Sequence, residues 1–243
     1  MRFFVSFFAV FWLLAPQTAH AAPPSLWTAE LTHPEITAAL KEGYDTILIP
    51  TGGVEQAGGH LITGKHNYIV TETAARIAAK RGRTLIAPVV PFAPEGAFDT
   101  SQGNMRYPGT ITLREETFTA LMEDIARSYL IHGFKTVLLI GDHGGSQEAL
   151  KRVAAALPGV IALTGYYTDN GQTAALQKQG FTAEQIGQHA GMLDTSELFA
   201  VYPAGVRVDA LKNSANPGGS GAPGLSTKEL GRVLLQLKVD AAH

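Results

Sequence analysis

The fold of this chain is decided by the stretch Ile49-Pro50-Thr51-Gly52-Gly53-Val54-Glu55-Gln56-Ala57-Gly58-Gly59-His60, which is followed by Gly64-Lys65-His66-Asn67. The apolar residues 46–49 lead into it and a proline with two glycines interrupts them, so a buried strand should end here and continue as a loop at the edge of a sheet. Ligands bind at the carboxyl ends of strands in open α/β sheets. We therefore expect Glu55, His60 and His66 beside a ligand-binding site.

A second segment repeats this design far downstream. Residues 136–140, Thr-Val-Leu-Leu-Ile, form an apolar, β-rich run that ends in Gly141-Asp142-His143-Gly144-Gly145-Ser146. Apolar periodicity and turn residues also predict strands at 85–90 and 160–163, a turn with a short strand at 108–113, and helices at 33–41, 66–80, 115–131, 147–157, 182–188, 193–201 and 226–239. Alternating strands and helices predict an α/β fold, with a mostly parallel sheet covered on both faces.

Length and composition are those of one globular domain. The chain has 243 residues, of which 45% are hydrophobic and 16% charged, enough for a sizeable core. Its formal net charge of -2 and the lack of a basic run argue against a nucleic-acid partner. No segment beyond the first 22 residues is apolar enough to span a bilayer. We expect residues 22–243 to form a single domain whose partners are soluble molecules or small substrates.

The first 21 residues have the pattern of a secretory signal peptide. Arg2 precedes the apolar run 3–15, and a polar turn then ends in Ala19-His20-Ala21. A membrane anchor or a buried first helix is the alternative, but the apolar run is short and Pro16 interrupts it. We expect a mature chain that starts at Ala22, is secreted or periplasmic and has no membrane contact after cleavage. The chain has no cysteine, so its stability must come from the core even in an oxidising compartment.

The two loops after the anchor strands carry residue types that bind metals. Glu55, His66 and His143 offer one carboxylate and two imidazoles, a set suited to zinc, iron or manganese with positions left for water. Such an ion lowers the pKa of bound water and polarises a carbonyl, as amide hydrolysis requires. His60, His189 and Asp194 are candidates for a further ligand, an orienting residue or a general acid or base. A structural role for each of these side chains remains the alternative.

Three motifs resemble those of the creatininase (creatinine amidohydrolase) family. Residues 50–61 resemble its Pro-x-Gly-Ser-x-Glu-Gln-His-Gly-Pro-His-Leu-Pro motif, residues 141–146 its Asn-Gly-His-Gly-Gly-Asn motif, and residues 189–196 its His-Ala-Gly-Glu-x-Glu-Thr-Ser motif. Residues 108–110 and 226–232 also fall in the expected order. The resemblance implies a three-layer αβα sandwich, an assembly that is often a homohexamer, and a metal pair that hydrolyses cyclic amides or formamide-type C–N bonds.

This chain departs from these motifs mainly at the positions that supply the ligands of the second metal. By the resemblance, the first metal belongs to the positions of Glu55, His66 and His143, with the bridging aspartate replaced by His66. The second metal would need ligands at positions where this chain has Ala57 and either Gly145 or Met192. None of these three side chains can take the place of the missing ligands. We therefore expect one divalent ion, with zinc favoured over manganese or iron, held by two imidazoles and one carboxylate.

The remaining residues receive roles by the same reasoning. His189 resembles the active-site histidine of the family and is expected to relay protons, while Asp194 is expected either to orient His189 or to cap the helix that follows. We expect His60 outside the metal shell. The resulting function is an exported metal-dependent amidohydrolase, and the alternative is an inactive family member that binds a ligand or partner. A serine hydrolase is a distant third, since the chain has no Gly-x-Ser-x-Gly elbow. Possible pocket-lining residues are Asp142, Ser146, Asp99, Ser101 and Tyr107.

Overall fold

The computed structural model describes residues 22–211 and 216–242. The predicted signal peptide, residues 1–21, lies outside this range. Within the described residues, no helix combines the length and the apolar character that a membrane crossing needs.

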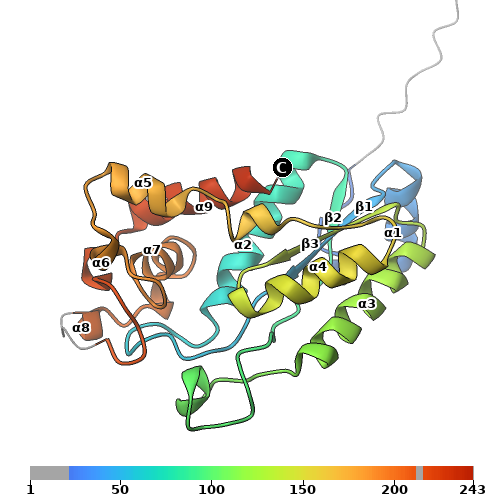
Figure 1. Ribbon diagram of the computed structural model, residues 1–243. Helices are drawn as coiled ribbons and strands as arrows, with labels where there is room; N and C mark the ends of the chain where they lie inside the picture. Colours follow the sequence, from blue (N-terminus) through green and yellow to red (C-terminus); the bar gives the residue numbers. More distant parts are fainter. Residues whose placement is uncertain (1–21, 212–215, 243) are drawn as a thin grey trace, which may run out of the picture.

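The described chain is built on a parallel sheet (Figure 1). Its strands are β1 (Thr46–Thr51), β2 (Thr84–Ile86), β3 (Thr136–Gly141) and β4 (Val160–Ala162), in the spatial order β2-β1-β3-β4. Every pairing is parallel, so the carboxyl ends of all four strands lie at one edge. This confirms the predicted sheet and places the loops after β1 and β3, which carry the two motifs, side by side.

Helices cover both faces of the sheet, as the alternation of buried side chains requires. Ile47 and Ile49 of β1 pack into a core with α1 (His33–Lys41), α3 (Glu115–Ile131) and α4 (Gln147–Ala156). Leu48, between them, faces the other core, which α2 (Lys65–Arg81) and α9 (Lys228–Ala241) complete. The result is the three-layer αβα sandwich that the family resemblance implied.

Helix α7 (Met192–Val201) lies outside α2 and α9 and brings the third motif toward the sheet. Its approach to α9 depends on Gly231, because a Cβ atom there would lie 1.8 Å from the carbonyl oxygen of Ser196. The loop before α7 contains His189, and the first turn of α7 contains Asp194. Close packing of these two helices therefore positions the third motif.

Three expectations about secondary structure were wrong. Residues 108–113 form no strand, only an isolated bridge between Ile111 and Val54. Strand β2 ends at Ile86, because Pro88 cannot continue the ladder of hydrogen bonds. The polar connection after β4 contains a helix that the sequence analysis did not predict, α5 (Gln172–Lys178). The short helix α6 (Ala183–Ile186) lies within the helix predicted at 182–188, whereas the short helix α8 (Val208–Leu211) was not predicted.

Candidate metal centre

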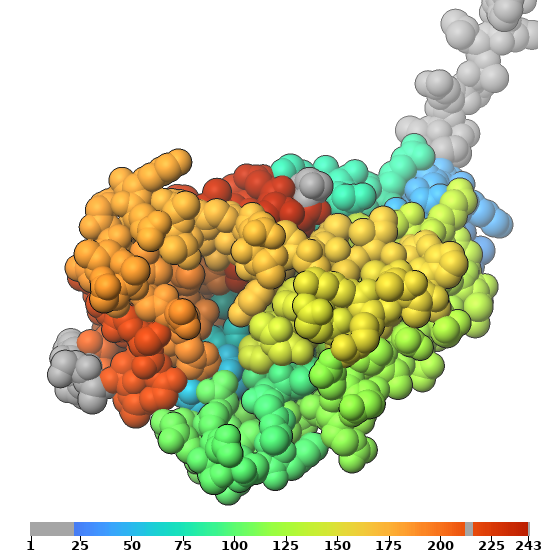
Figure 2. Space-filling model, viewed as in Figure 1, coloured from blue at the N-terminus to red at the C-terminus, as the bar shows by residue number. Residues whose placement is uncertain are grey.

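The loops after β1 and β3, the start of α2 and the loop before α7 meet at the carboxyl edge of the sheet. One ligand atom each of Glu55, His66 and His143 lies within 4.8 Å of the others. The pocket at this point has a volume of about 210 Å³. Figure 2 shows this face hollowed between the yellow chain that follows β3 and the orange chain of α5 and α6. The side chains lining the pocket are Glu55, His66, His143, Tyr167, Gln188, His189 and Asp194, together with Gly144.

Glu55 is the centre of this cluster and is almost fully buried. Its Oε1 lies 2.8 Å from Lys65 Nζ and 2.9 Å from His66 Nε2. Its Oε2 accepts a hydrogen bond from Asn104 Nδ2 and lies 3.5 Å from His143 Nε2. Burial raises the pKa of Glu55, but the Lys65 ammonium and the two imidazoles outweigh it and keep the pKa below its ordinary value. The carboxylate is therefore ionised and available as a ligand.

His66 is oriented from behind by a buried network. Its Nδ1 lies 2.9 Å from Asp142 Oδ2, and Asp142 Oδ1 accepts hydrogen bonds from Lys238 Nζ (2.7 Å) and the Tyr166 hydroxyl (2.7 Å). Burial raises the pKa of Asp142, but Lys238 and His66 hold it below its usual value. An ionised Asp142 accepts from His66 Nδ1–H, so Nε2 is the nitrogen directed toward Lys65 and Glu55.

Lys65, which the sequence analysis did not single out, lies inside the same cluster. Its side chain is fully buried, and Nζ lies 2.6 Å from His66 Nε2 and 3.5 Å from Asp194 Oδ2 in addition to its contact with Glu55. Burial lowers the pKa of Lys65, but Asp194 and Glu55 raise it to about 12. A fixed positive charge therefore stands against Glu55 and His66. Its sequence signal was weak, since a lysine at a helix start is usually exposed.

His143 faces a second carboxylate that the sequence analysis also missed. Its Nε2 lies 2.8 Å from Glu95 Oε2, and its Nδ1 accepts a hydrogen bond from the backbone N–H of Gly145 (3.1 Å). Burial lowers the pKa of His143, whereas Glu55 and Glu95 raise it to about 9. Burial raises the pKa of Glu95, and His143 opposes that shift. The length of the 91–108 loop was the one indication that it carried a functional residue.

His189 presents one ring nitrogen to the cluster. Its Nε2 lies 2.8 Å from the carbonyl oxygen of Gln56 and 3.0 Å from Gln56 Nε2. Both protons of that amide are used by Asn104 Oδ1 and the carbonyl of Gly218, each at 2.9 Å, so His189 Nε2–H donates to the Gln56 carbonyl. Its Nδ1, 3.5 Å from Glu55 Oε1, is then the atom that can take up or release a proton in the pocket.

Asp194 lines the pocket but has no hydrogen bond to His189 among the described residues. Its Oδ2 accepts from the backbone N–H of Ala190 (2.9 Å) and so ties the first turn of α7 to the loop before it; α7 begins at Met192, so Asp194 is not its N-cap and the capping alternative was wrong in that respect. Burial raises the pKa of Asp194, and the charges of Lys65, His66 and His189 lower it below its usual value. His60 is buried with its Nε2 2.9 Å from Thr195 Oγ1, and it does not line the pocket.

The other expected pocket residues have structural roles. Asp142 supports His66 as described above. Ser146 Oγ donates to the carbonyl oxygen of His143 (2.7 Å), and no described imidazole forms a hydrogen bond with it. The serine hydrolase hypothesis therefore lacks a base that could activate this hydroxyl. Asp99 and Ser101 are exposed and hydrogen-bond each other, and neither they nor Tyr107 line the pocket.

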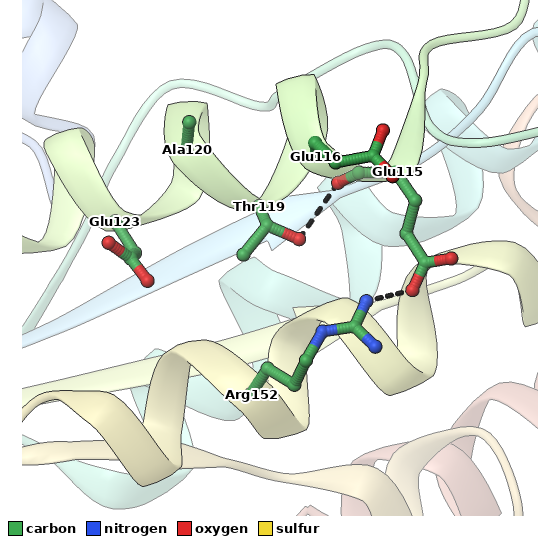
Figure 3. A pocket seen from close by; sticks show the side chains of 6 residues that line it. All are labelled: Glu115, Glu116, Thr119, Ala120, Glu123 and Arg152. Carbon is green, nitrogen blue, oxygen red and sulfur yellow. Dashed lines mark hydrogen bonds and ion pairs between the residues drawn. The ribbon is translucent and has the colours of Figure 1, made fainter.

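A separate depression lies on the surface between α3 and α4 (Figure 3). Thr119 bonds back to the Glu115 carbonyl, and the Arg152 guanidinium pairs with the Glu115 carboxylate. Glu115 and Arg152 are about half exposed, so water solvates these charges. Its lining is completed by Glu116, Ala120 and Glu123. This surface has the features of ordinary solvated helix faces, and the buried cluster around Glu55 remains the candidate site.

Comparison with known proteins identifies the family. The family model Creatininase, described as creatinine amidohydrolase, matches residues 29–242. This chain belongs to the creatininase family. Creatinine amidohydrolase of Pseudomonas putida is 27% identical over 198 residues, covering 76% of this chain and 75% of that protein. The 3-dehydro-scyllo-inosose hydrolase of Thermotoga maritima is 25% identical and the match covers 74% of this chain but 58% of that protein. Mycofactocin precursor peptide peptidase of Mycobacterium ulcerans is 30% identical over 177 residues, covering 72% of this chain and 66% of that protein.

Solved creatininase structures share the fold. A crystal structure of creatinine amidohydrolase has a TM-score of 0.68 at 23% identity, over 90% of this chain and 95% of that one. A mutant creatininase described as Zn-Zn type has a TM-score of 0.69 at 24% identity, over 89% and 95%. These matches confirm the fold, and the family model confirms the family, that the three motifs indicated.

Proposed function

We propose that this chain is an exported, metal-dependent amidohydrolase that cleaves a small cyclic amide or a related C–N bond, with one divalent ion at Glu55, His66 and His143. The observation that carries the proposal is the convergence of these three ligand atoms within 4.8 Å at the floor of a pocket. Its matched relatives include two hydrolases of small molecules and a peptidase that acts on a precursor peptide, so the restriction to a non-peptide bond is part of the proposal.

The residues present fit a divalent ion. Asp142 accepts from His66 Nδ1–H, the arrangement that metal-binding histidines commonly have. Glu55 is ionised and buried, and Glu95, beside His143, has a buried Oε1 without a hydrogen bond to any described residue. An ion bound here would supply Lewis-acid polarisation of the amide carbonyl and activation of water. We propose zinc, with manganese or iron as alternatives, since this donor set accepts all three.

The chain's own groups perform the remaining chemistry. His189 Nδ1 faces Glu55 across the pocket and is the group we assign to proton transfer, taking a proton from the attacking water and returning it to the leaving nitrogen. The Gln56 carbonyl fixes the ring, since it accepts from His189 Nε2. Asp194 holds the start of α7 and adds negative charge beside Lys65, so its role is positional. The pocket of about 210 Å³ suits a small substrate.

Two properties of the whole protein are proposed with this function. We infer from residues 1–21 that the chain is exported to the periplasm or the cell exterior. We infer from the family resemblance that it forms a homo-oligomer, with a hexamer as the specific expectation. Light scattering of the purified mature protein gives the mass that tests the second point.

Metal content tests the function. Purified mature protein is analysed by plasma mass spectrometry beside Glu55→Ala, His66→Ala and the exposed control His132→Ala, and all four are assayed against a panel of cyclic and linear amides. We expect about one ion per chain in the wild type and the control, loss of the ion in the two site variants, and amide hydrolysis only where the ion remains. Absence of metal after incubation with zinc, manganese and iron would overturn the proposal.

A metal-free ligand-binding role is the second candidate, and Lys65 is the observation that favours it. The ammonium already satisfies Glu55 Oε1 and His66 Nε2, so the cluster is charge-balanced on that side without an ion. Under this alternative the wild type takes up no ion and hydrolyses no amide, yet binds a small molecule in the pocket.

A further inference from the structure

Glu95 is a buried carboxylate whose position the proposed metal set does not explain. Its side chain is inaccessible to solvent, and Oε1 has no hydrogen-bond partner in the part of the chain that is described. Oε2 pairs with His143 Nε2 at 2.8 Å. Burying a carboxylate with so few partners costs free energy, so such a group calls for a cation or a functional role.

The loops after β1 and β3, which carry Gly53 and Gly145, leave space for this carboxylate. A Cβ atom at Gly53 would lie 2.5 Å from Glu95 Oε1, and a Cβ atom at Gly145 would lie 1.9 Å from the carbonyl oxygen of Pro94. Gly53 stands where the motif has serine, and Gly145 is one of the positions at which the expected carboxylate ligand is missing. The segment that carries Glu95 therefore occupies space that side chains at these two positions would fill.

Lys65 and Glu95 lie on opposite sides of Glu55. Lys65 Nζ contacts Glu55 Oε1 and His66 Nε2, whereas His143 Nε2 lies between Glu55 Oε2 at 3.5 Å and Glu95 Oε2 at 2.8 Å. Two atoms that bind one tetrahedral ion at about 2.0–2.2 Å are themselves about 3.3–3.6 Å apart. The separation of Glu55 Oε2 and His143 Nε2 matches this range, and Glu95 Oε2, 2.8 Å from the same nitrogen, would bind the ion with them after an outward shift of about half an ångström. Positive charge from Lys65 also favours the His143 side for an ion.

We propose that Glu95 is a further ligand of the ion, bound on the His143 side together with Glu55. The carboxylate that the chain lacks at position 145 thus comes from a different loop, which enters between Gly53 and Gly145. This inference rests on the proposed metal site and adds a ligand to it. Lys65 supplies the second positive charge of the centre, in the place of a second ion.

Metal affinity tests the ligand role without any assay of turnover. Chelator-treated wild type, Glu95→Gln and the exposed control Glu116→Gln are titrated with zinc, and with cobalt to record its visible absorption. We expect Glu95→Gln to weaken the binding of both ions at least tenfold and to change the cobalt spectrum. Loss of even an outer partner of a ligand lowers metal affinity by about 10–100-fold. Its metal-free melting temperature should not fall, and Glu116→Gln should match the wild type.

A second variant separates a ligand from a residue that merely packs. Gly53→Ala keeps the Glu95 carboxylate but displaces it, so this variant should also weaken metal binding. In the Glu95→Gln background, Gly53→Ala should lower the metal affinity no further. Should Glu95→Gln fail to fold, Glu95→Asp, which withdraws the carboxylate by one methylene, replaces it. Affinity of Glu95→Gln within twofold of a metal-binding wild type would overturn the ligand role alone. A wild type that binds no ion would overturn both this inference and the proposed function.

Discussion

At the scale of single residues, the centre is a balance of buried charges. Glu55, Glu95, Asp142 and Asp194 supply negative charge, while Lys65 and Lys238 supply fixed positive charge around the imidazoles. Each imidazole has a defined nitrogen toward the pocket because a carboxylate or a backbone group takes the other one. The chemistry of the site is therefore set by partners as much as by the ligands themselves.

Replacement of Lys65 should separate its effect on folding stability from its effect on metal affinity. In Lys65→Met the buried partners Glu55 and Asp194 lose their cation, so the metal-free protein should lose about 3–5 kcal/mol of stability. Metal affinity should instead rise at least tenfold, since a like charge is removed and Glu55 Oε1 and His66 Nε2 become free. Denaturant unfolding and zinc titration measure the two quantities, with the exposed Lys41→Met as control. Weaker metal binding by Lys65→Met would show that Lys65 organises the site instead of competing with the ion.

Metal affinity should also depend on pH through His143. In the metal-free protein Glu55 and Glu95 raise the pKa of His143 to about 9, so at pH 7 an ion bound at Nε2 releases one proton and leaves the other on Nδ1, which then no longer accepts from the Gly145 N–H. Affinity should rise by about tenfold per pH unit from 7 to 9 and level off above. The sign follows from the raised pKa: the proton stabilises the metal-free fold most below the unfolded value of 6.5, and this contribution disappears as the pH rises through 9. Calorimetry in two buffers counts the released proton, and His143→Asn should flatten the profile.

At the scale of elements, the approach of α7 to α9 positions the third motif. Gly231→Ala places a Cβ atom 1.8 Å from the Ser196 carbonyl and must push the helices apart. Overpacking of this kind costs about 1–3 kcal/mol. We expect a lower melting temperature and weaker amide hydrolysis, since His189 directly precedes α7. Val233→Ala, at an exposed position of the same helix, should leave the melting temperature and the hydrolysis rate equal to those of the wild type within error. An unchanged melting temperature of Gly231→Ala would contradict the packing argument.

The sequence predicts the elements that carry strong periodicity or sharp boundaries. Strand β1 ends at Thr51, just before Gly52, and β3 ends at Gly141, each within two residues of the expected position, and α3 has the predicted bounds. These elements placed Glu55, His66 and His143 at one edge. Lys65 and Glu95 escaped prediction because their roles depend on burial against segments distant in sequence, which periodicity does not encode. Helix α5 escaped because its seven residues are mostly polar and carry a weak apolar pattern.

At the scale of the whole molecule, the proposed export can be tested independently of the metal. Arg2 and the apolar run 3–15, followed by Ala19-His20-Ala21, predict cleavage before Ala22. Expressed in a bacterium with an intact secretion pathway, the chain should be recovered from the periplasm or the medium with the mass of residues 22–243. Val10→Arg places a charge in the apolar run and should leave the full-length chain inside the cell. A wild type of full-length mass that fractionates with the cytoplasm would overturn the export proposal while leaving the metal site untouched, because that site is formed entirely by residues after position 54.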